Sequence, residues 1–366
     1  GTVKADDNLG RLALFMAFFP QIVEGPICRY SQTAEQLWNV KAIQFDNLRM
    51  GVIRILYGMM KKLVVADRLN AAIKIVFSDY AQYSGGIIAL AAVMYTIQLY
   101  MDFSGSMDAV VGTAQIFGVK MPENFLRPFF SRNISEFWKR WHASLGEWFK
   151  DYVFYPVTMS KPMKKLTSSA RKKLGNHFGP LIAGGVALFL VWFFNGLWHG
   201  AEWNYILFGM YHFVLILMGS LFAPLTQKIN KLLHLKPENR AFAAFQMIRT
   251  GILVVIGEMF FRAEGFSACT GMLARLITKF EFTPLSAELL KNLHIDVQDF
   301  VITGITLLIV LAVGILNERG ASVRDWMMER KTWIRWAILY AMILYIVLFG
   351  AYGPNYLPVD PMYAFF

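Results

Sequence analysis

The feature that most constrains this chain is an unbroken apolar stretch at residues 181–200, which reads LIAGGVALFLVWFFNGLWHG. A helix needs about 20 such residues to cross the hydrocarbon core of a bilayer. Near its end the stretch carries Asn195 and His199, each followed by a glycine. An ionisable side chain at membrane depth is costly unless it has a partner or a function. His199 is therefore either a structural histidine, held at a helix interface or at the headgroup level, or part of an active site.

The composition also indicates a membrane protein. Of the 366 residues 56% are hydrophobic and only 17% are charged, whereas about a quarter of the residues in a soluble domain are charged. The net charge of +11 is typical of Lys and Arg in cytoplasmic loops. Cys28 and Cys269 lie far apart, without the spacing of a disulfide framework or a metal site. We predict an all-α, polytopic integral membrane protein with no bound metal and no nucleic-acid partner.

The chain begins with a polar segment that lacks the apolar core of a signal peptide. We expect residues 1–366 to form a single membrane domain that lacks N-terminal transmembrane helices of the natural protein. Hydropathy predicts roughly eight to eleven helices.

Residues 12–28 are apolar but interrupted by prolines and a glycine, which break a helix. Broken backbone at membrane depth is tolerated only where protein or a cavity surrounds it. This segment is expected to be re-entrant and to line a cavity, with Glu24 inside it and Arg29 at its edge. Residues 87–103 predict a spanning helix that ends near Asp102, the third polar candidate for such a lining.

Two charged stretches receive different predictions. Residues 46–77 alternate apolar and charged side chains, a pattern that predicts amphipathic helices in the membrane interface. Residues 161–173 hold six basic residues and no acidic one. This second stretch is expected to be a cytoplasmic loop, and contact with anionic lipid or with an acidic partner is an alternative use.

Residues 132–155 are rich in aromatic side chains. Asn133 and Glu136 resemble a capping box at the start of a helix. Helical spacing then places Trp141 in one aromatic row and Trp138 with His142 in the adjacent row. Most of these rings fit the aromatic belt of an interfacial helix, but that interpretation does not explain His142.

Familiar catalytic motifs are absent. The sequence contains no phosphate-binding P-loop, no HExxH zinc helix and no GxSxG nucleophile elbow. What remains is acid–base chemistry on histidine, because an imidazole is neutral near pH 7 and can accept a proton from an attacking hydroxyl. That chemistry is sufficient when the acyl donor is an activated thioester.

Two long motifs resemble the membrane-bound O-acyltransferase (MBOAT) family. They are FWKRWHASLGEWFKDYVFYP at residues 137–156 and FFNGLWHGAEWNYILFGMYH at residues 193–212. They are most similar to the bacterial branch that contains alginate O-acetyltransferases and teichoic acid D-alanyltransferases. FFPQIVEGPICRY at residues 18–30 and MDFSGSMD at residues 101–108 match the same branch.

The resemblance implies that His199 is the catalytic histidine and His142 the second functional histidine. It also implies a ring of tilted transmembrane and re-entrant helices around a central tunnel, in the bacterial cell membrane. The donor would be acetyl-coenzyme A or an acyl group on the phosphopantetheine of a small acidic carrier protein, and it would bind as a substrate. No cofactor would be held permanently. The acceptor would be an extracytoplasmic cell-envelope polysaccharide, and an extracytoplasmic acyltransferase is a candidate partner.

The sequence therefore predicts a membrane O-acyltransferase that transfers acetyl groups, with histidine as general base. Asn195 lies one helical turn before His199 and is expected to contribute a hydrogen bond. Trp198 joins Trp138 and Trp141 among the aromatic candidates for the substrate site. D-alanyl transfer toward teichoic acid is the alternative within the same class. A transporter or flippase, with residues 20–26 as a midplane site, is the alternative from another class.

Overall fold

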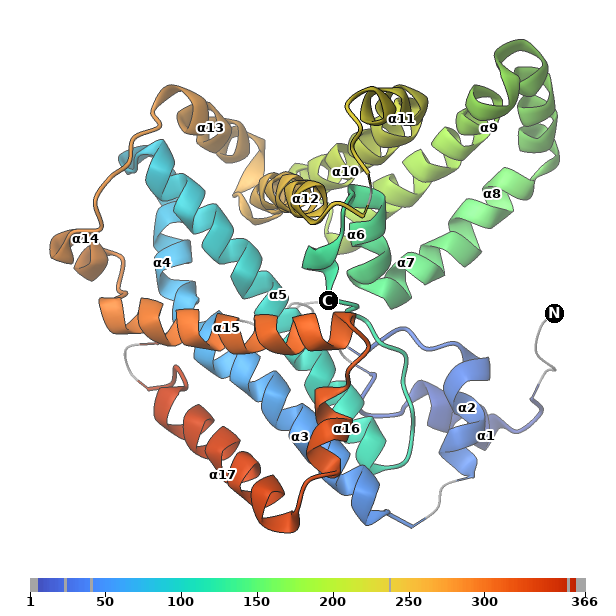
Figure 1. Cartoon of the computed structure of the whole chain (residues 1–366). Coiled ribbons are helices and arrows are strands. Elements are labelled where there is room, and N and C mark those ends of the chain that lie inside the picture. Colours follow the sequence, from blue (N-terminus) through green and yellow to red (C-terminus); the bar gives the residue numbers. More distant parts are fainter. Residues whose placement is uncertain (1–5, 23–24, 40–41, 237, 354–355, 360–366) are drawn as a thin grey trace. The chain divides into compact units, whose positions relative to one another are not determined.

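The computed structural model describes residues 6–22, 25–39, 42–236, 238–353 and 356–359 (Figure 1). It is 78% helical, and no strand occurs among the described residues. Six of the described helices are long and apolar enough to cross a membrane: α5 (Gly85–Ile116), α9 (Lys161–His199), α10 (Trp203–Leu221), α12 (Arg240–Arg262), α15 (Val297–Glu318) and α17 (Thr332–Phe349). The all-α polytopic prediction is confirmed. Fewer helices qualify than hydropathy predicts, because interrupted apolar stretches form only short helices.

The chain divides into two compact units. The first consists of residues 1–76, 93–125 and 282–366, and the second of residues 77–92 and 126–281. Besides α15, α17 and most of α5, the first unit holds α1 (Leu9–Met16), α2 (Tyr30–Trp38), α3 (Phe45–Met59), the π-helical segment η1 (Met60–Ala66), most of α4 (Asp67–Ser78), α14 (Ala287–Asn292) and α16 (Val323–Met328).

In the first unit, α3, η1 and α4 follow one another without a break and carry buried charges. Arg54 donates hydrogen bonds to the carboxylates of Asp108 and Glu123. The ammonium of Lys61 lies 2.5 Å from an Asp108 oxygen and donates to the Ser104 hydroxyl. Helices form over residues 46–77 as predicted, but most of their charged side chains pair with protein partners instead of forming a polar face toward water. The location of these helices in the membrane interface stays a prediction.

Close backbone packing supports this charge cluster. A Cβ atom on Gly58 of α3 would lie 2.3 Å from the carbonyl oxygen of Gly105 in α5. A Cβ atom on Gly105 would in turn lie 2.7 Å from the Gly58 carbonyl oxygen. Small residues at such crossings let helix backbones come into direct contact in membrane proteins. The crossing holds α3 and α5 close enough for Arg54 to reach Asp108.

The second unit contains α9, α10 and α12 together with shorter elements. These are η2 (Tyr80–Gln82), η3 (Pro128–Phe130), α6 (Ile134–Arg140), α7 (Ala143–Phe149), the π-helical η4 (Lys150–Phe154), α8 (Tyr155–Met159), α11 (Ala223–Leu232) and α13 (Gly265–Thr278). The central helix is α10, which packs along both α9 and α12 and also contacts α6 and α13. Side chains from α6, α9 and α10 meet in its aromatic core.

Helix α9 reverses direction at Gly175, which has a left-handed φ of 79° (Figure 1). A Cβ atom on Gly179 would lie 2.5 Å from the Cα of Arg171, so the chain folds back on itself. Residues 161–174 form a basic arm and residues 176–199 form a membrane arm. The loop prediction for residues 161–173 is wrong, because Lys, Arg, Met, Leu and Ala favour a helix and the turn comes only at the glycine.

Candidate active site

The helix predicted for residues 132–155 is broken at His142. Helix α6 ends at Arg140, Trp141 is extended, and His142 has a left-handed backbone with φ 46° and ψ 49°. The carbonyl oxygen of His142 accepts hydrogen bonds from the backbone N–H groups of Leu145 and Gly146 in the first turn of α7. Trp138 and His142 therefore do not share a row on one helix face, and that part of the prediction is wrong.

The conformation of His142 is unusual for a residue that is not glycine. Such conformations cost on the order of 1–3 kcal/mol and are concentrated at functional sites. The segment leading to it is anchored as predicted, since the Asn133 side chain accepts a hydrogen bond of 2.9 Å from the Glu136 N–H. The Glu136 carboxylate accepts from the N–H of Arg132 instead of Asn133, so only half of the predicted capping box forms.

His199 is the last residue of α9. The next residue, Gly200, has a φ of 154°, and a Cβ atom on it would lie 2.6 Å from the ring of Tyr205. A side chain at position 200 would therefore displace Tyr205 or unfold the end of α9. The glycine lets the chain turn sharply after His199 and leaves the imidazole at the end of the membrane arm.

The two predicted histidines meet at one indole ring. The ring centroid of Trp198 lies 5.9 Å from that of His142 and 4.8 Å from that of His199. His142 is 7% exposed, whereas Trp198 is 40% exposed and His199 is half-buried. Burial, and to a smaller extent the nearby His199, lowers the pKa of the His142 imidazole to about 3. His142 is therefore neutral at physiological pH.

Aromatic rings surround His199 on its other sides. Phe261 of α12 lies 5.0 Å from it and Phe208 of α10 lies 6.2 Å from it, both edge to face. Tyr205 lies 6.5 Å away. This environment lowers the local dielectric, which strengthens any hydrogen bond or charge that forms at the imidazole during a reaction.

Asn195 lies on α9 one turn before His199, as predicted, and is 9% exposed. Its Oδ1 atom has no hydrogen-bond partner among the described residues. A buried polar atom without a partner needs an explanation. The Asn195 Oδ1 atom therefore needs a partner that the described residues do not supply, and its place in the substrate site stays a prediction.

The two tryptophans of the α6 segment differ. Trp141 stacks on Phe137 at 5.4 Å and belongs to the packing of α6. Trp138 instead donates its indole N–H to Nδ1 of His212 on α10, at 3.1 Å. Because Nδ1 is the acceptor, the neutral His212 ring carries its proton on Nε2. That buried Nε2 atom has no partner among the described residues.

Sequence reasoning missed His212, which is fully buried and packs against Phe208, the same ring that contacts His199. The available signal was its place in the motif at residues 193–212, where it is the second histidine. The two histidines are 13 positions apart on different helices, so no helical periodicity links them.

The remaining predicted side chains lie in the first unit or outside the described residues. The Asp102 carboxylate is 2.7 Å from the Lys62 ammonium and is buried. Arg29 is the N-cap residue directly before α2, where its N–H donates to the side chain of Gln32. Glu24 lies outside the described residues. A role for these groups in lining a tunnel stays a prediction.

An all-helical membrane protein that places two histidines against one indole is suited to proton transfer in an apolar setting. Residues 8–171 match the family model of membrane-bound O-acyltransferases. The matched segment includes His142 and ends before His199. The chain belongs to this family, and it is a multi-pass membrane protein.

Relatives with curated names match along most of the chain. The probable alginate O-acetylase AlgI of Pseudomonas aeruginosa is 33% identical over 272 residues, which are 74% of this chain and 46% of the relative. The teichoic acid D-alanyltransferase of Bacillus subtilis is 32% identical over 73% of this chain and 64% of the relative. The peptidoglycan O-acetyltransferase of Helicobacter pylori is 31% identical over 60% of this chain and 38% of the relative. The chain thus spans about half the length of the alginate O-acetylases it matches.

Proposed function

We propose that this protein is a membrane O-acyltransferase that acts on a cell-envelope polymer. It would move an acyl group, with acetyl as the first choice, from a cytoplasmic thioester donor to hydroxyls of an extracytoplasmic polysaccharide. The observation that carries the proposal is the pair of imidazoles, His142 and His199, packed against Trp198. The names of the relatives support it, since all three describe transfer of an acetyl or D-alanyl group.

His199 acts as the general base. Its neutral imidazole accepts the proton of the acceptor hydroxyl while that oxygen forms a bond to the thioester carbonyl carbon. The carbon–sulfur bond then breaks, and the leaving thiolate takes up the proton from the imidazolium. A positioned general base typically contributes about 10²–10⁴-fold to the rate. The exposed edge of Trp198 and the half-buried His199 leave the ring accessible to a substrate.

His142 has a supporting role. Because its pKa is lowered by burial, it stays neutral and offers one donor and one acceptor nitrogen. It would hold the acyl group or the acceptor against the Trp198 ring and orient it toward His199. Asn195 would add a hydrogen bond from the preceding turn of α9.

The acyl donor is a substrate and not a resident cofactor. Acetyl-coenzyme A and an acyl group on the phosphopantetheine of a carrier protein supply the same reacting group, a thioester. The relatives include both acetyl and D-alanyl transferases. D-alanyl transfer is the second candidate, because the B. subtilis D-alanyltransferase is covered over a larger share of its length than the alginate O-acetylase.

Acyl transfer in proteoliposomes tests the proposal. Radiolabelled acetyl-coenzyme A is supplied on one side and alginate, peptidoglycan fragments or another polysaccharide on the other, and a parallel set receives D-alanyl carrier protein with lipoteichoic acid. We expect covalent label on a polymer in one of the two sets. Movement of substrate across the membrane without any covalent product would identify a transporter and would overturn the proposal.

A further inference from the structure

A second feature of the second unit is an apolar groove between the membrane arm of α9 and helix α10. Its volume is about 600 Å³, and every side chain that lines it is apolar. Phe178, Ile182, Val186 and Phe189 recur along one face of α9, and Phe213 with Leu217 faces them from α10. The four α9 side chains are each about two-fifths exposed, so no described residue covers the groove.

The length of the groove matches one leaflet of a bilayer. From Phe178 to Phe189 the helix rises about 16 Å at 1.5 Å per residue. The hydrocarbon core of a bilayer is about 30 Å thick. The groove is therefore about as long as the hydrocarbon layer of one leaflet, which is about half of that thickness.

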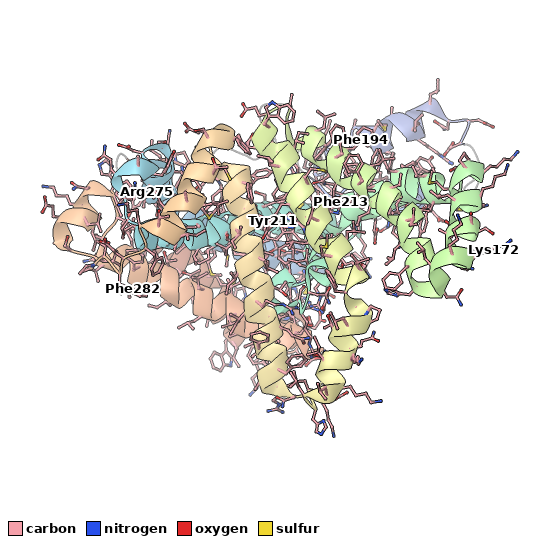
Figure 2. The ribbon with its side chains drawn as sticks, turned by 90° about the horizontal axis from the view of Figure 1, so that it is seen from above. Lys172, Phe194, Tyr211, Phe213, Arg275 and Phe282 are labelled. Atoms are coloured by element: carbon pink, nitrogen blue, oxygen red, sulfur yellow. The ribbon has the colours of Figure 1, made fainter. Side chains whose placement is uncertain are left out.

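Cations gather at one end of the groove. Leu174, the last residue of the basic arm, lines this end. Arg171, Lys172 and Lys173 directly precede it with exposed side chains, and Figure 2 labels Lys172. The reversal at Gly175 holds the arm in place, as the contact of Gly179 with Arg171 shows. Arg171 is thus held beside the first turns of the membrane arm, and Lys172 and Lys173 follow it on the basic arm.

No acidic side chain offsets these cations on the two groove helices. Residues 152–201 contain six Lys or Arg and no Asp or Glu, and residues 203–237 contain three Lys and again no acid. Near the same end of the groove, Nε2 of His177 on α9 lies 3.2 Å from the carbonyl oxygen of Ser220 on α10. An apolar groove that opens at a cluster of cations is complementary to an anionic headgroup with an attached acyl chain.

We propose that the groove between α9 and α10 binds an anionic phospholipid, with one acyl chain along Phe178–Phe189 and the phosphate against Arg171, Lys172 and Lys173. Orientation of the chain by cytoplasmic positive charge would explain basic residues in general. It would not explain a cluster held at the end of a groove as deep as one leaflet. The proposal is independent of the acyl-transfer reaction, since it concerns a lipid that is held and not consumed.

The test is native mass spectrometry of the full chain from mixed micelles that contain phosphatidylglycerol and phosphatidylcholine with identical acyl chains at equal mole fraction. Juxtamembrane Lys and Arg each favour anionic lipid, so we expect phosphatidylglycerol to be retained about tenfold or more over phosphatidylcholine. Equal retention of the two lipids would overturn the proposal. Retention of neither would also overturn it and would indicate that protein covers the groove.

A matched pair of variants locates the headgroup site. The triple substitution Arg171→Gln, Lys172→Gln and Lys173→Gln is expected to bring the ratio of retained phosphatidylglycerol to phosphatidylcholine close to one. The control triple substitution Lys161→Gln, Lys164→Gln and Lys165→Gln removes the same charge from the far end of the same arm and should keep most of the preference. If both variants lose the preference equally, the attraction is diffuse and there is no site.

A third variant tests the groove itself. A Cβ atom on Gly185 would contact only Leu217, at 3.5 Å, so Gly185→Leu fits the helix and directs its side chain toward the groove. We expect this variant to lose bound phosphatidylglycerol while its thermal midpoint in detergent stays near that of the parent. Unchanged lipid retention in a folded Gly185→Leu variant would show that no acyl chain occupies the groove.

Discussion

The two units of this protein treat buried polar groups in opposite ways. In the first unit the buried charges are paired, with Arg54 and Lys61 both on Asp108, and Lys62 on Asp102. In the second unit, the buried imidazoles of His142 and His212 instead lie against aromatic rings. Asn195 Oδ1 and His212 Nε2 are among the buried polar atoms of this unit that have no partner among the described residues.

We infer from this difference that the paired charges of the first unit stabilise the fold, whereas the neutral imidazoles of the second unit take part in the reaction. A charge network that is fully paired lowers the free energy of the folded state only while all of its members remain, because a single buried charge without a partner is very costly. A neutral imidazole with an accessible edge can instead change partners during a reaction. We therefore expect substitutions in the first unit to act on stability and substitutions around His199 to act on turnover.

The largest effect is expected from His199→Ala. Loss of the general base should lower the rate of acyl transfer by about 10²–10⁴-fold, with little change in expression or in the thermal midpoint in detergent. The rate is measured in the proteoliposome assay at saturating donor. His177→Ala is the matched control, because it removes an exposed imidazole from the same helix. Activity of His199→Ala within a few fold of the parent would make His199 structural.

In the first unit, the largest effect on stability is expected from Asp108→Asn. This change leaves Arg54 and Lys61 buried without their shared carboxylate, and breaking a buried pair typically costs about 3–5 kcal/mol. The expected result is a loss of folded protein, measured as the free energy of unfolding in mixed detergent and denaturing micelles.

The control for this prediction is Asp46→Asn, in the same unit. Asp46 pairs with Arg49 at the exposed surface, where its side chain is 74% exposed. Such surface pairs contribute about 0–1 kcal/mol. If the two asparagine variants are equally stable, the charge cluster does not hold the first unit together.

A smaller effect on turnover is expected from His142→Asn. Asn tolerates the left-handed backbone of position 142 and keeps one donor and one acceptor, but it cannot reproduce the imidazole. We expect turnover to fall by roughly tenfold, less than the ~10²–10⁴-fold effect of removing a general base. The parallel variant His142→Gln has a longer side chain with the same polar groups. Near-normal turnover in both variants would reduce the site to a single histidine.

The sequence predicts those parts of the site that depend on neighbouring residues. A sufficiently long apolar stretch places His199 at the end of a spanning helix, and the spacing of four positions places Asn195 on the same helix. Gly200 also fits this local logic, because its φ is one that other residues rarely adopt.

The parts that were missed depend on residues that are distant in sequence or on local strain. No glycine or proline marks the break at His142, so periodicity extends the helix through it. The sequence around Arg54 of α3 predicts an interfacial helix, because its partners Asp108 and Glu123 follow only 54 and 69 positions later and cannot be recognised from the local pattern. The hydrogen bond that distinguishes His212 comes from Trp138, which is 74 positions away in the sequence.

The smallest expected effect is on stability, and it comes from the hydrogen bond between Trp138 and His212. Trp138→Phe removes the N–H that His212 Nδ1 accepts, and a buried acceptor left without its donor costs about 1–3 kcal/mol. His212→Leu alone should be similarly destabilising, because it leaves the indole N–H without an acceptor. In the double variant both polar partners are gone, so we expect less destabilisation than the sum of the two single changes, by about 0.5–3 kcal/mol.

Trp148→Phe, at a partly exposed indole on α7, is the control and should show no coupling to His212→Leu. If the Trp138 cycle is additive as well, the hydrogen bond does not link α6 to α10, and His212 is only a packed ring beside Phe208.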